Sequence, residues 1–210
     1  MNVETNPFPH AVSNWSEDPF TRSMVTAAGA EMPPPETEGW RRFGNDQEFT
    51  LEGPPALWGP QTVEFFDRLS GLGPMFSALF DLPDLHMETI GGGYHLIPPG
   101  GYLDVHTDFS VSPATGRYRR VNVLTFLNRD WQPDDGGHLE LWDENGCVVS
   151  IPPEFGTTVA FVTSSTSWHG HPKPAKRWRA SLAAYFFTDE PPPDFREQST
   201  VWHPNGGRRA

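Results

Sequence analysis

The sequence predicts a mainly β protein whose core is a double-stranded β-helix, or jelly roll, with N-terminal helices packed against it. The chain has 23 prolines and 20 glycines among its 210 residues, which argues against long uninterrupted helices. From about residue 87, short apolar runs alternate with glycine, proline and aspartate, as in sandwiches and barrels of antiparallel strands. The expected strands are 87–90, 93–97, 102–107, 120–127, 138–142, 147–151, 157–162 and 179–187.

Residues 1–86 are expected to form an arm and supporting helices. The start of this region is rich in proline and acidic residues, and its scattered aromatic side chains favour an arm that packs over the core. Helical spacing of apolar residues appears at 62–69 and again at 75–80. Pro83 is expected to end the second helix, because proline cannot continue one.

The remainder of the chain divides into a core and a tail. Residues 87–190 are expected to form the β-helix core, and residues 191–210 a proline-rich tail that Phe195 and Trp202 anchor. No internal repeat interrupts this order. We therefore expect a single domain overall, large enough to bury a hydrophobic core.

Charge and cysteine content restrict the class of protein. A formal net charge of −12 makes non-specific nucleic-acid binding unexpected, because the phosphate backbone repels such a surface. No apolar run is long enough for a membrane span, and no secretory signal is visible at the start. Cys147 is the single cysteine, which excludes an internal disulfide, fits a cytoplasmic protein and predicts a small buried residue.

The most informative segment contains His106 and Asp108, two residues apart on an expected strand. Alternate residues on a strand point to the same face, so both side chains can reach one point in space. His169, far downstream, supplies a second imidazole. Two imidazoles and one carboxylate form the ligand set of non-haem Fe(II) oxygenases, which leaves further metal positions open. By itself, the His106–Asp108 pair is equally consistent with a hydrogen-bonded pair at the surface.

The block from Gly91 to Thr188 resembles the Fe(II)/2-oxoglutarate-dependent dioxygenases, specifically their prolyl 4-hydroxylase-like branch. The matching segments are 91–95, 100–109, 119–128 with Trp131, 136–142, 169–172 and 179–187. These segments follow the family order and cover nearly half of the chain. The N-terminal region carries no comparable signal.

The resemblance implies that His106, Asp108 and His169 bind Fe(II), with 2-oxoglutarate as cosubstrate and O2 as oxidant; ascorbate is a candidate reductant. It implies that Arg179 grips the distal carboxylate of 2-oxoglutarate, a task for which the planar guanidinium fork is suited. Animal collagen prolyl hydroxylases usually have lysine there, whereas arginine is common in bacterial relatives. Ser181 shares a strand face with Arg179 and is expected to assist it.

Other polar residues have two interpretations each. Tyr94 is expected to contact the cosubstrate or to be a core aromatic, and Asn122 to donate to 2-oxoglutarate or to satisfy buried backbone. The family motif places the metal ligand directly before Gly-x-Pro, which selects His169 over His171. His171 is then a residue behind the ligands, a substrate-facing residue or a plain loop histidine. Arg119 and Arg120 are interpreted as solvated charges rather than as contacts to an anionic substrate.

The expected function is hydroxylation of an unactivated C–H bond in a small molecule, amino acid or biosynthetic intermediate, with release of succinate and CO2. Desaturation and cyclisation use the same cofactors and stay open. Asp108 disfavours halogenation, because halogenating relatives replace this carboxylate with a small residue. The alternatives are a hydroxylase of a peptidyl residue, a cupin-like isomerase or lyase without 2-oxoglutarate, and a non-catalytic binding module. The sequence gives no indication of an oligomeric state.

Overall fold

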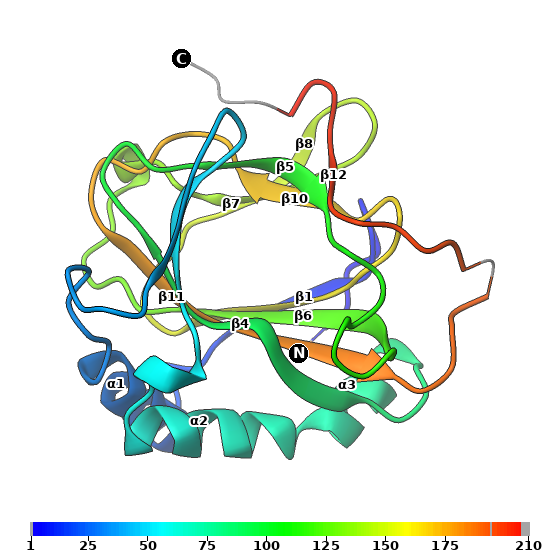
Figure 1. Ribbon diagram of the computed structural model, residues 1–210, viewed down its shortest axis with the longest axis horizontal. Coiled ribbons are helices and arrows are strands. Elements are labelled where there is room, and N and C mark those ends of the chain that lie inside the picture. Colours follow the sequence, from blue (N-terminus) through cyan, green and yellow to red (C-terminus); the bar gives the residue numbers. More distant parts are fainter. Residues whose placement is uncertain (1, 194, 207–210) are drawn as a thin grey trace.

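The computed structural model describes residues 2–193 and 195–206 as two antiparallel sheets that face each other, with helices beneath the larger sheet (Figure 1). The larger sheet has the order β1 (His10–Asn14), β9 (Thr157–Val162), β6 (Tyr118–Phe126), β11 (Arg179–Thr188), β4 (His86–Ile97), β3 (Phe49–Gly53) and β2 (Arg41–Gly44). The smaller sheet has the order β12 (Val201–Trp202), β5 (Leu103–Thr107), β10 (Trp168–His171), β7 (Leu139–Trp142) and β8 (Cys147–Ile151). This arrangement confirms the predicted jelly roll.

The helices lie against the outer face of the larger sheet. They are α1 (Pro19–Ala30), α2 (Pro60–Ser70) and α3 (Gly73–Phe80), and short 3-10 turns occur at Pro55–Leu57 and Pro133–Asp135. Helices α2 and α3 confirm the two helices that the apolar spacing at 62–69 and 75–80 predicts. Helix α1 was not predicted, although its start signal is present in the sequence. The Asp18 carboxylate accepts hydrogen bonds from the Phe20 and Thr21 backbone N–H groups, at 3.0 Å each, and proline opens the helix.

The N-terminal arm is built into the larger sheet. Strand β1 pairs with β9, and the β2–β3 hairpin extends the sheet beyond β4. Gly93 allows β3 to approach closely: its φ is +119°, and a Cβ there would lie 2.4 Å from the Gly53 carbonyl oxygen. The C-terminal tail also pairs, since β12 adds to β5 at the edge of the smaller sheet. Both ends of the chain therefore help to enclose the space between the sheets.

The two strands predicted at 87–90 and 93–97 are one strand, β4, interrupted by an irregularity. Its pairing with β11 shifts register between Ala183 and Tyr185, beside the glycine run 91–93. Glycine tolerates such an irregularity because it has no side chain to displace. Strand β10, absent from the predicted list, carries His169 and His171.

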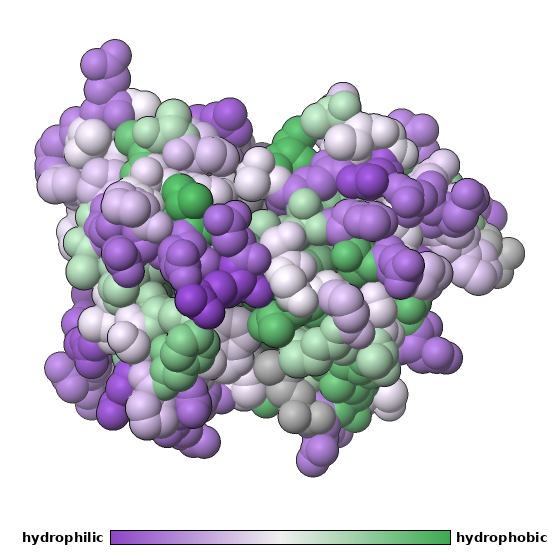
Figure 2. All heavy atoms as spheres, turned by 90° about the horizontal axis from the view of Figure 1, so that it is seen from below, coloured by the Kyte–Doolittle hydropathy of each residue, from purple (hydrophilic) through white to green (hydrophobic). Residues whose placement is uncertain are grey.

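The main hydrophobic core lies between the larger sheet and the helices. Phe65, Phe66 and Leu69 of α2 and Phe76 of α3 are buried there, and the Phe76 ring meets Phe186 of β11 at 5.2 Å between centroids. Burial of such aromatic side chains is a main source of stability. Seen from the helix side, the surface mixes hydrophilic and hydrophobic residues (Figure 2). The core therefore leaves the opposite face of the sheet free to form a site.

Two further observations concern solvent and membrane. Cys147 is exposed rather than buried, because it opens β8, the edge strand of the smaller sheet. The prediction of a buried cysteine was wrong. Among the described residues, none of the helices has the length and apolar character needed to cross a membrane.

Candidate metal centre and cosubstrate pocket

Three side chains predicted as metal ligands meet between the two sheets. His106 lies on β5, Asp108 directly follows that strand, and His169 lies opposite His106 on β10. The ligand atoms of the three residues all lie within 4.8 Å of one another. The Asp108 carboxylate oxygens are 3.7 Å from Nε2 of His106 and 3.5 Å from Nε2 of His169. The spacing inferred from strand alternation therefore brings the predicted residues together.

Hydrogen bonds orient both imidazoles toward this centre. Nδ1 of His106 lies 2.9 Å from the Asp104 carbonyl oxygen, and Nδ1 of His169 lies 2.9 Å from the Ser167 carbonyl oxygen. An Nδ1–H that donates to a carbonyl fixes the tautomer in which Nε2 keeps its lone pair. Both Nε2 atoms are thus prepared as ligands.

This donor set fits a divalent transition metal such as Fe(II). Metal–ligand bonds of about 2.1 Å hold neighbouring ligand atoms roughly 3 Å apart, and small side-chain movements bring the observed separations to that value. Imidazole nitrogen and carboxylate oxygen in this ratio form the facial triad of non-haem Fe(II) oxygenases. These three residues would hold such an ion with three protein ligands, which would leave further positions for a cosubstrate and O2.

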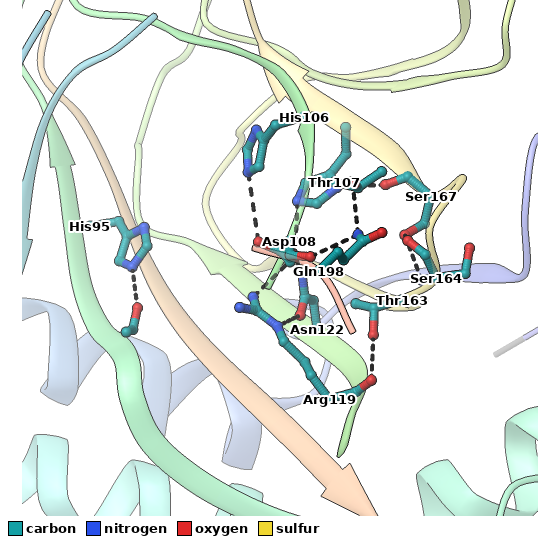
Figure 3. A network of polar contacts seen from close by, with 12 residues as sticks. His95, His106, Thr107, Asp108, Arg119, Asn122, Thr163, Ser164, Ser167 and Gln198 are labelled. Carbon is teal, nitrogen blue, oxygen red and sulfur yellow. Dashed lines mark hydrogen bonds and ion pairs between the residues drawn. The ribbon is translucent and has the colours of Figure 1, made fainter. Parts of the chain in front are cut away.

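The Asp108 carboxylate is held by a polar network (Figure 3). Arg119 Nη2 lies 3.1 Å from Asp108 Oδ2, and the Asn122 side-chain amide donates to the same oxygen at 2.8 Å. Nε of Arg119 in turn donates to Oδ1 of Asn122 at 2.9 Å. Gln198, from the C-terminal tail, donates to the Asp108 carbonyl oxygen at 3.0 Å. Asp108, Asn122 and Arg119 therefore each contact the other two, and these contacts fix the position of the Asp108 carboxylate.

Charge and burial act in opposite directions on these groups. Burial raises the pKa of Asp108, but the charge of the neighbouring Arg119 outweighs it and holds the pKa well below its ordinary value. Burial lowers the pKa of His169 to about 4. Near neutral pH, the aspartate is therefore ionised and His169 is neutral, which are the protonation states that bind a metal.

Gly170 and Trp202 shape the surroundings of the histidines. A Cβ at Gly170 would lie 2.8 Å from the carbonyl oxygens of both Leu103 and Asp104, so glycine lets β10 approach β5 closely. The Trp202 ring, from β12, lies 5.3 Å from the His106 ring between centroids. The C-terminal tail therefore forms a wall of the centre.

A cavity of about 370 Å³ adjoins the three ligands. Arg179 and Ser181 line it together with Asn122. Arg179 is 3 % exposed; its Nε donates to the Gly137 carbonyl oxygen at 2.7 Å, and its guanidinium lies over the Phe126 ring. No carboxylate in the described part of the chain pairs with it, and burial lowers its pKa to about 9. A buried guanidinium without a counter-charge is prepared to bind an anion.

Further polar side chains also reach this cavity. His171 lines it, and burial, followed by the charge of Arg179, lowers the pKa of this imidazole well below its ordinary value. His95 lines it as well, with Nε2 3.1 Å from the Gly91 carbonyl oxygen. Glu48 and Glu52 come from the β3 region, which carried no sequence signal. Burial raises the pKa of Glu48.

Tyr94 does not lie in the cavity. Its side chain is fully buried on the helix side of the sheet, where its hydroxyl contacts Thr62 and donates to the Ala28 carbonyl oxygen at 3.2 Å. The pairing of β4 with β11 explains this: Ile97 and His95 lie opposite Arg179 and Ser181, so Tyr94 points to the other face. The expected cosubstrate contact was wrong, and the core-aromatic interpretation holds.

The positions of Asn122 and Arg119 differ from those expected from the sequence, which were a cosubstrate or backbone contact for Asn122 and a solvated charge for Arg119. Asn122 lines the cavity, but its side chain is engaged with Asp108 and Arg119. Arg119 is buried rather than solvated, and its guanidinium lies 3.6 Å from the Tyr185 ring centroid. Local sequence gave no signal for this contact. In a regular strand Arg119 and Asn122 would face opposite sides, but a bulge opposite Phe186 and Phe187 changes the alternation.

Comparison with known proteins gives a family match for the segment that carries these residues. Residues 92–187 match the family model of the 2OG-Fe(II) oxygenase superfamily. This segment contains His106, Asp108, His169 and Arg179. No curated protein shows significant similarity to the chain.

Several solved structures share the fold. A prolyl-4-hydroxylase from Pseudomonas putida is 20% identical, with a TM-score of 0.63 over 85% of this chain and 91% of that one. A prolyl hydroxylase from Trichoplax adhaerens, in complex with a hypoxia inducible factor peptide fragment, is 17% identical, with a TM-score of 0.57 over 85% and 83%. A 2OG-Fe(II) oxygenase family oxidoreductase from Burkholderia pseudomallei is 14% identical, with a TM-score of 0.54 over 96% and 88%.

Jelly roll, candidate ligand triad and buried arginine are together the features expected from the sequence for a non-haem iron oxygenase. Residues 92–187 of the chain match the 2OG-Fe(II) oxygenase superfamily, and prolyl 4-hydroxylases are among the solved structures that share its fold. The protein is a dioxygenase, and the cofactors of this superfamily are Fe(II), 2-oxoglutarate and O2.

Proposed function

We propose that this protein hydroxylates an unactivated C–H bond of a small molecule, an amino acid or a biosynthetic intermediate, and releases succinate and CO2. The observation that carries the proposal is that one cavity is lined by His106, Asp108 and His169 and by Arg179, whose guanidinium has no carboxylate partner in the described part of the chain. A chelating keto acid needs a metal at one end and a cation at the other, and the cavity offers ligands for the metal and Arg179 as the cation.

Each residue has a defined task in this proposal. His106, Asp108 and His169 hold the iron, while Arg119 and Asn122 keep the Asp108 carboxylate in position. Arg179 binds the distal carboxylate of 2-oxoglutarate, and Ser181 stands beside it on the same strand face. Bound iron and 2-oxoglutarate supply the oxidising chemistry that places an oxygen atom from O2 on the substrate carbon.

The volume of the cavity favours a compact substrate. At about 370 Å³ it lies near the lower end of the range for small-ligand sites, and the cosubstrate takes part of that space. Phe43 and Thr50 from the N-terminal hairpin region line it, as do Thr200 and Trp202 from the tail. The substrate side of the cavity is therefore enclosed by segments that lie outside the block from Gly91 to Thr188, which resembles the family.

Hydroxylation of a peptidyl residue is the second candidate. The structural neighbours that favour it are the Pseudomonas putida prolyl-4-hydroxylase and the Trichoplax adhaerens prolyl hydroxylase, which was solved with a peptide fragment. One side chain of a peptide would fit the same cavity. A cupin-like isomerase or lyase has no need of the buried cation at Arg179, and the family match also disfavours that alternative.

A succinate-release screen tests the proposal. The protein, supplied with Fe(II), 2-oxoglutarate and O2, is incubated with free amino acids, sugars, carrier-bound intermediates and proline-containing peptides. We expect succinate release to rise with a compound of the first groups, and mass spectrometry to show a gain of one oxygen atom. Turnover restricted to peptides would transfer the assignment to the second candidate. Absence of 2-oxoglutarate binding would contradict both.

A further inference from the structure

His171 is a polar side chain inside the cavity for which the fold provides no partner. Its side chain is 4 % exposed, and its Nδ1 makes no hydrogen bond to any other residue in the described ranges 2–193 and 195–206. Buried polar atoms are rarely left unsatisfied in folded proteins. No side chain or backbone group among the described residues therefore holds this imidazole through Nδ1, although the residue lines the cavity.

The position of His171 identifies the part of the cavity concerned. It lies two residues beyond His169 on β10, so both side chains face the space between the sheets. Two residues advance roughly 7 Å along a strand, which carries His171 away from the metal centre. Arg179 lines the same cavity and has no carboxylate partner among the described residues.

The burial pattern of the ring indicates which nitrogen can bind. Nδ1 is inaccessible, so the remaining edge of the ring, which carries Nε2, forms the part of the wall that faces the cavity. A neutral imidazole carries its proton on one nitrogen only. Nε2 is therefore the ring nitrogen that a ligand in the cavity can meet, and as an N–H group it would donate to a carboxylate.

We propose that His171 is a second hydrogen-bond donor to the distal carboxylate of 2-oxoglutarate, beside Arg179, and that it selects for keto acids with a second carboxylate. This inference rests on the proposed function, since it assumes that 2-oxoglutarate occupies the cavity. The guanidinium supplies the charge, and the imidazole adds a directed hydrogen bond from the facing sheet. Two donors from opposite sheets define the position of a carboxylate better than one.

Equilibrium binding to the Zn(II)-loaded protein tests this role without turnover. Isothermal titration calorimetry compares wild type with His171→Leu and His171→Gln, using 2-oxoglutarate and 2-oxopentanoate, which has equal chain length and no second carboxylate. His138→Leu is the matched control, because His138 also has an unpartnered ring nitrogen but does not line the cavity. Zinc stoichiometry and thermal unfolding show that each variant is folded.

We expect His171→Leu to weaken 2-oxoglutarate binding about 10-fold or more, the effect of one hydrogen bond to a charged group. Binding of 2-oxopentanoate should change little, His171→Gln should recover part of the affinity, and His138→Leu should bind as wild type does. Unchanged 2-oxoglutarate binding in His171→Leu, or equal losses for both keto acids, would overturn the inference while leaving the proposed function intact. Failure of the wild type to bind 2-oxoglutarate would overturn both.

Discussion

The guanidinium of Arg119 lies 3.1 Å from the carboxylate of Asp108, the residue that completes the metal triad. Arg119 is packed against Tyr185 on one side and contacts Phe109 on the other, so its position is fixed by rings as well as by charge. Before a metal arrives, this cation is the main compensation for a buried aspartate. Arg119 thus keeps the Asp108 carboxylate ionised and in place.

Replacing Arg119 with methionine should therefore destabilise the metal-free protein by roughly 3 kcal/mol or more, because it leaves a buried carboxylate without a counter-charge. Zn(II) should restore a larger share of stability to Arg119→Met than to wild type, since the ion supplies the missing charge. Urea unfolding with chelator and with zinc measures both effects. The double variant Arg119→Met with Asp108→Asn is the control, and it should be more stable than Arg119→Met when metal-free. Equal metal stabilisation in wild type and Arg119→Met would contradict this account.

The stability of the metal-free protein should decrease in mild acid. Burial lowers the pKa of His169 from 6.5 to about 4, so the unfolded chain binds this proton first as the pH falls. The free energy of unfolding should therefore drop between about pH 6.5 and pH 4, by roughly 3 kcal/mol from this group. Chemical unfolding at several pH values measures the slope. His169→Asn should reduce it without abolishing it, because the pKa values of His171 and His138 are also lowered. An unaltered slope would argue against a neutral His169.

Tyr94→Phe tests the corrected placement of that residue. The hydroxyl contacts Thr62 and the Ala28 carbonyl group on the helix side of the sheet, remote from the cavity. Loss of these bonds should lower the free energy of unfolding by about 1 kcal/mol. The 2-oxoglutarate titration should not change. A marked loss of 2-oxoglutarate affinity in a normally stable variant would return Tyr94 to the cosubstrate site.

Arg179→Ala should raise the 2-oxoglutarate requirement strongly, by about 10- to 100-fold, while zinc or iron binding stays close to that of wild type. The reason is that Arg119, the other buried arginine of the cavity, is paired with Asp108, whereas Arg179 has no carboxylate partner among the described residues. Titration of 2-oxoglutarate against each metal-loaded protein measures the effect. Arg179→Lys is the informative control, since it retains the charge without the fork. An unchanged titration in Arg179→Ala would remove this residue from the cosubstrate site.

Much of the metal centre was predictable because it depends on short-range geometry. His106 and Asp108 share a face through strand alternation, and the motif around His169 supplied the third ligand. Arg179 opens an apolar strand, where a solvated arginine would be out of place. The His106–Asp108 pair needs no knowledge of how strands pair. His169 was assigned through the family resemblance, because its position opposite His106 depends on the pairing of β10 with β5.

The remaining features depend on long-range pairing, which local pattern does not contain. Tyr94 and His95 are neighbours, and only the register between β4 and β11 decides which of them faces the cavity. The partnership of Arg119 with Asp108 depends on a bulge in the β6–β11 pairing. Trp202 reaches the metal centre because the tail pairs with β5, a contact between segments far apart in sequence.

The central claim is that the triad binds iron and that 2-oxoglutarate binds through it. Anaerobic titration of Fe(II) into the metal-free protein, followed by 2-oxoglutarate, measures this directly by calorimetry and by the visible absorption of the iron–keto acid chelate. The account predicts stoichiometric iron binding, 2-oxoglutarate binding that requires the iron, and loss of both in Asp108→Ala. Binding of 2-oxoglutarate that is equally tight without metal, or an Asp108→Ala variant that behaves as wild type does, would contradict it.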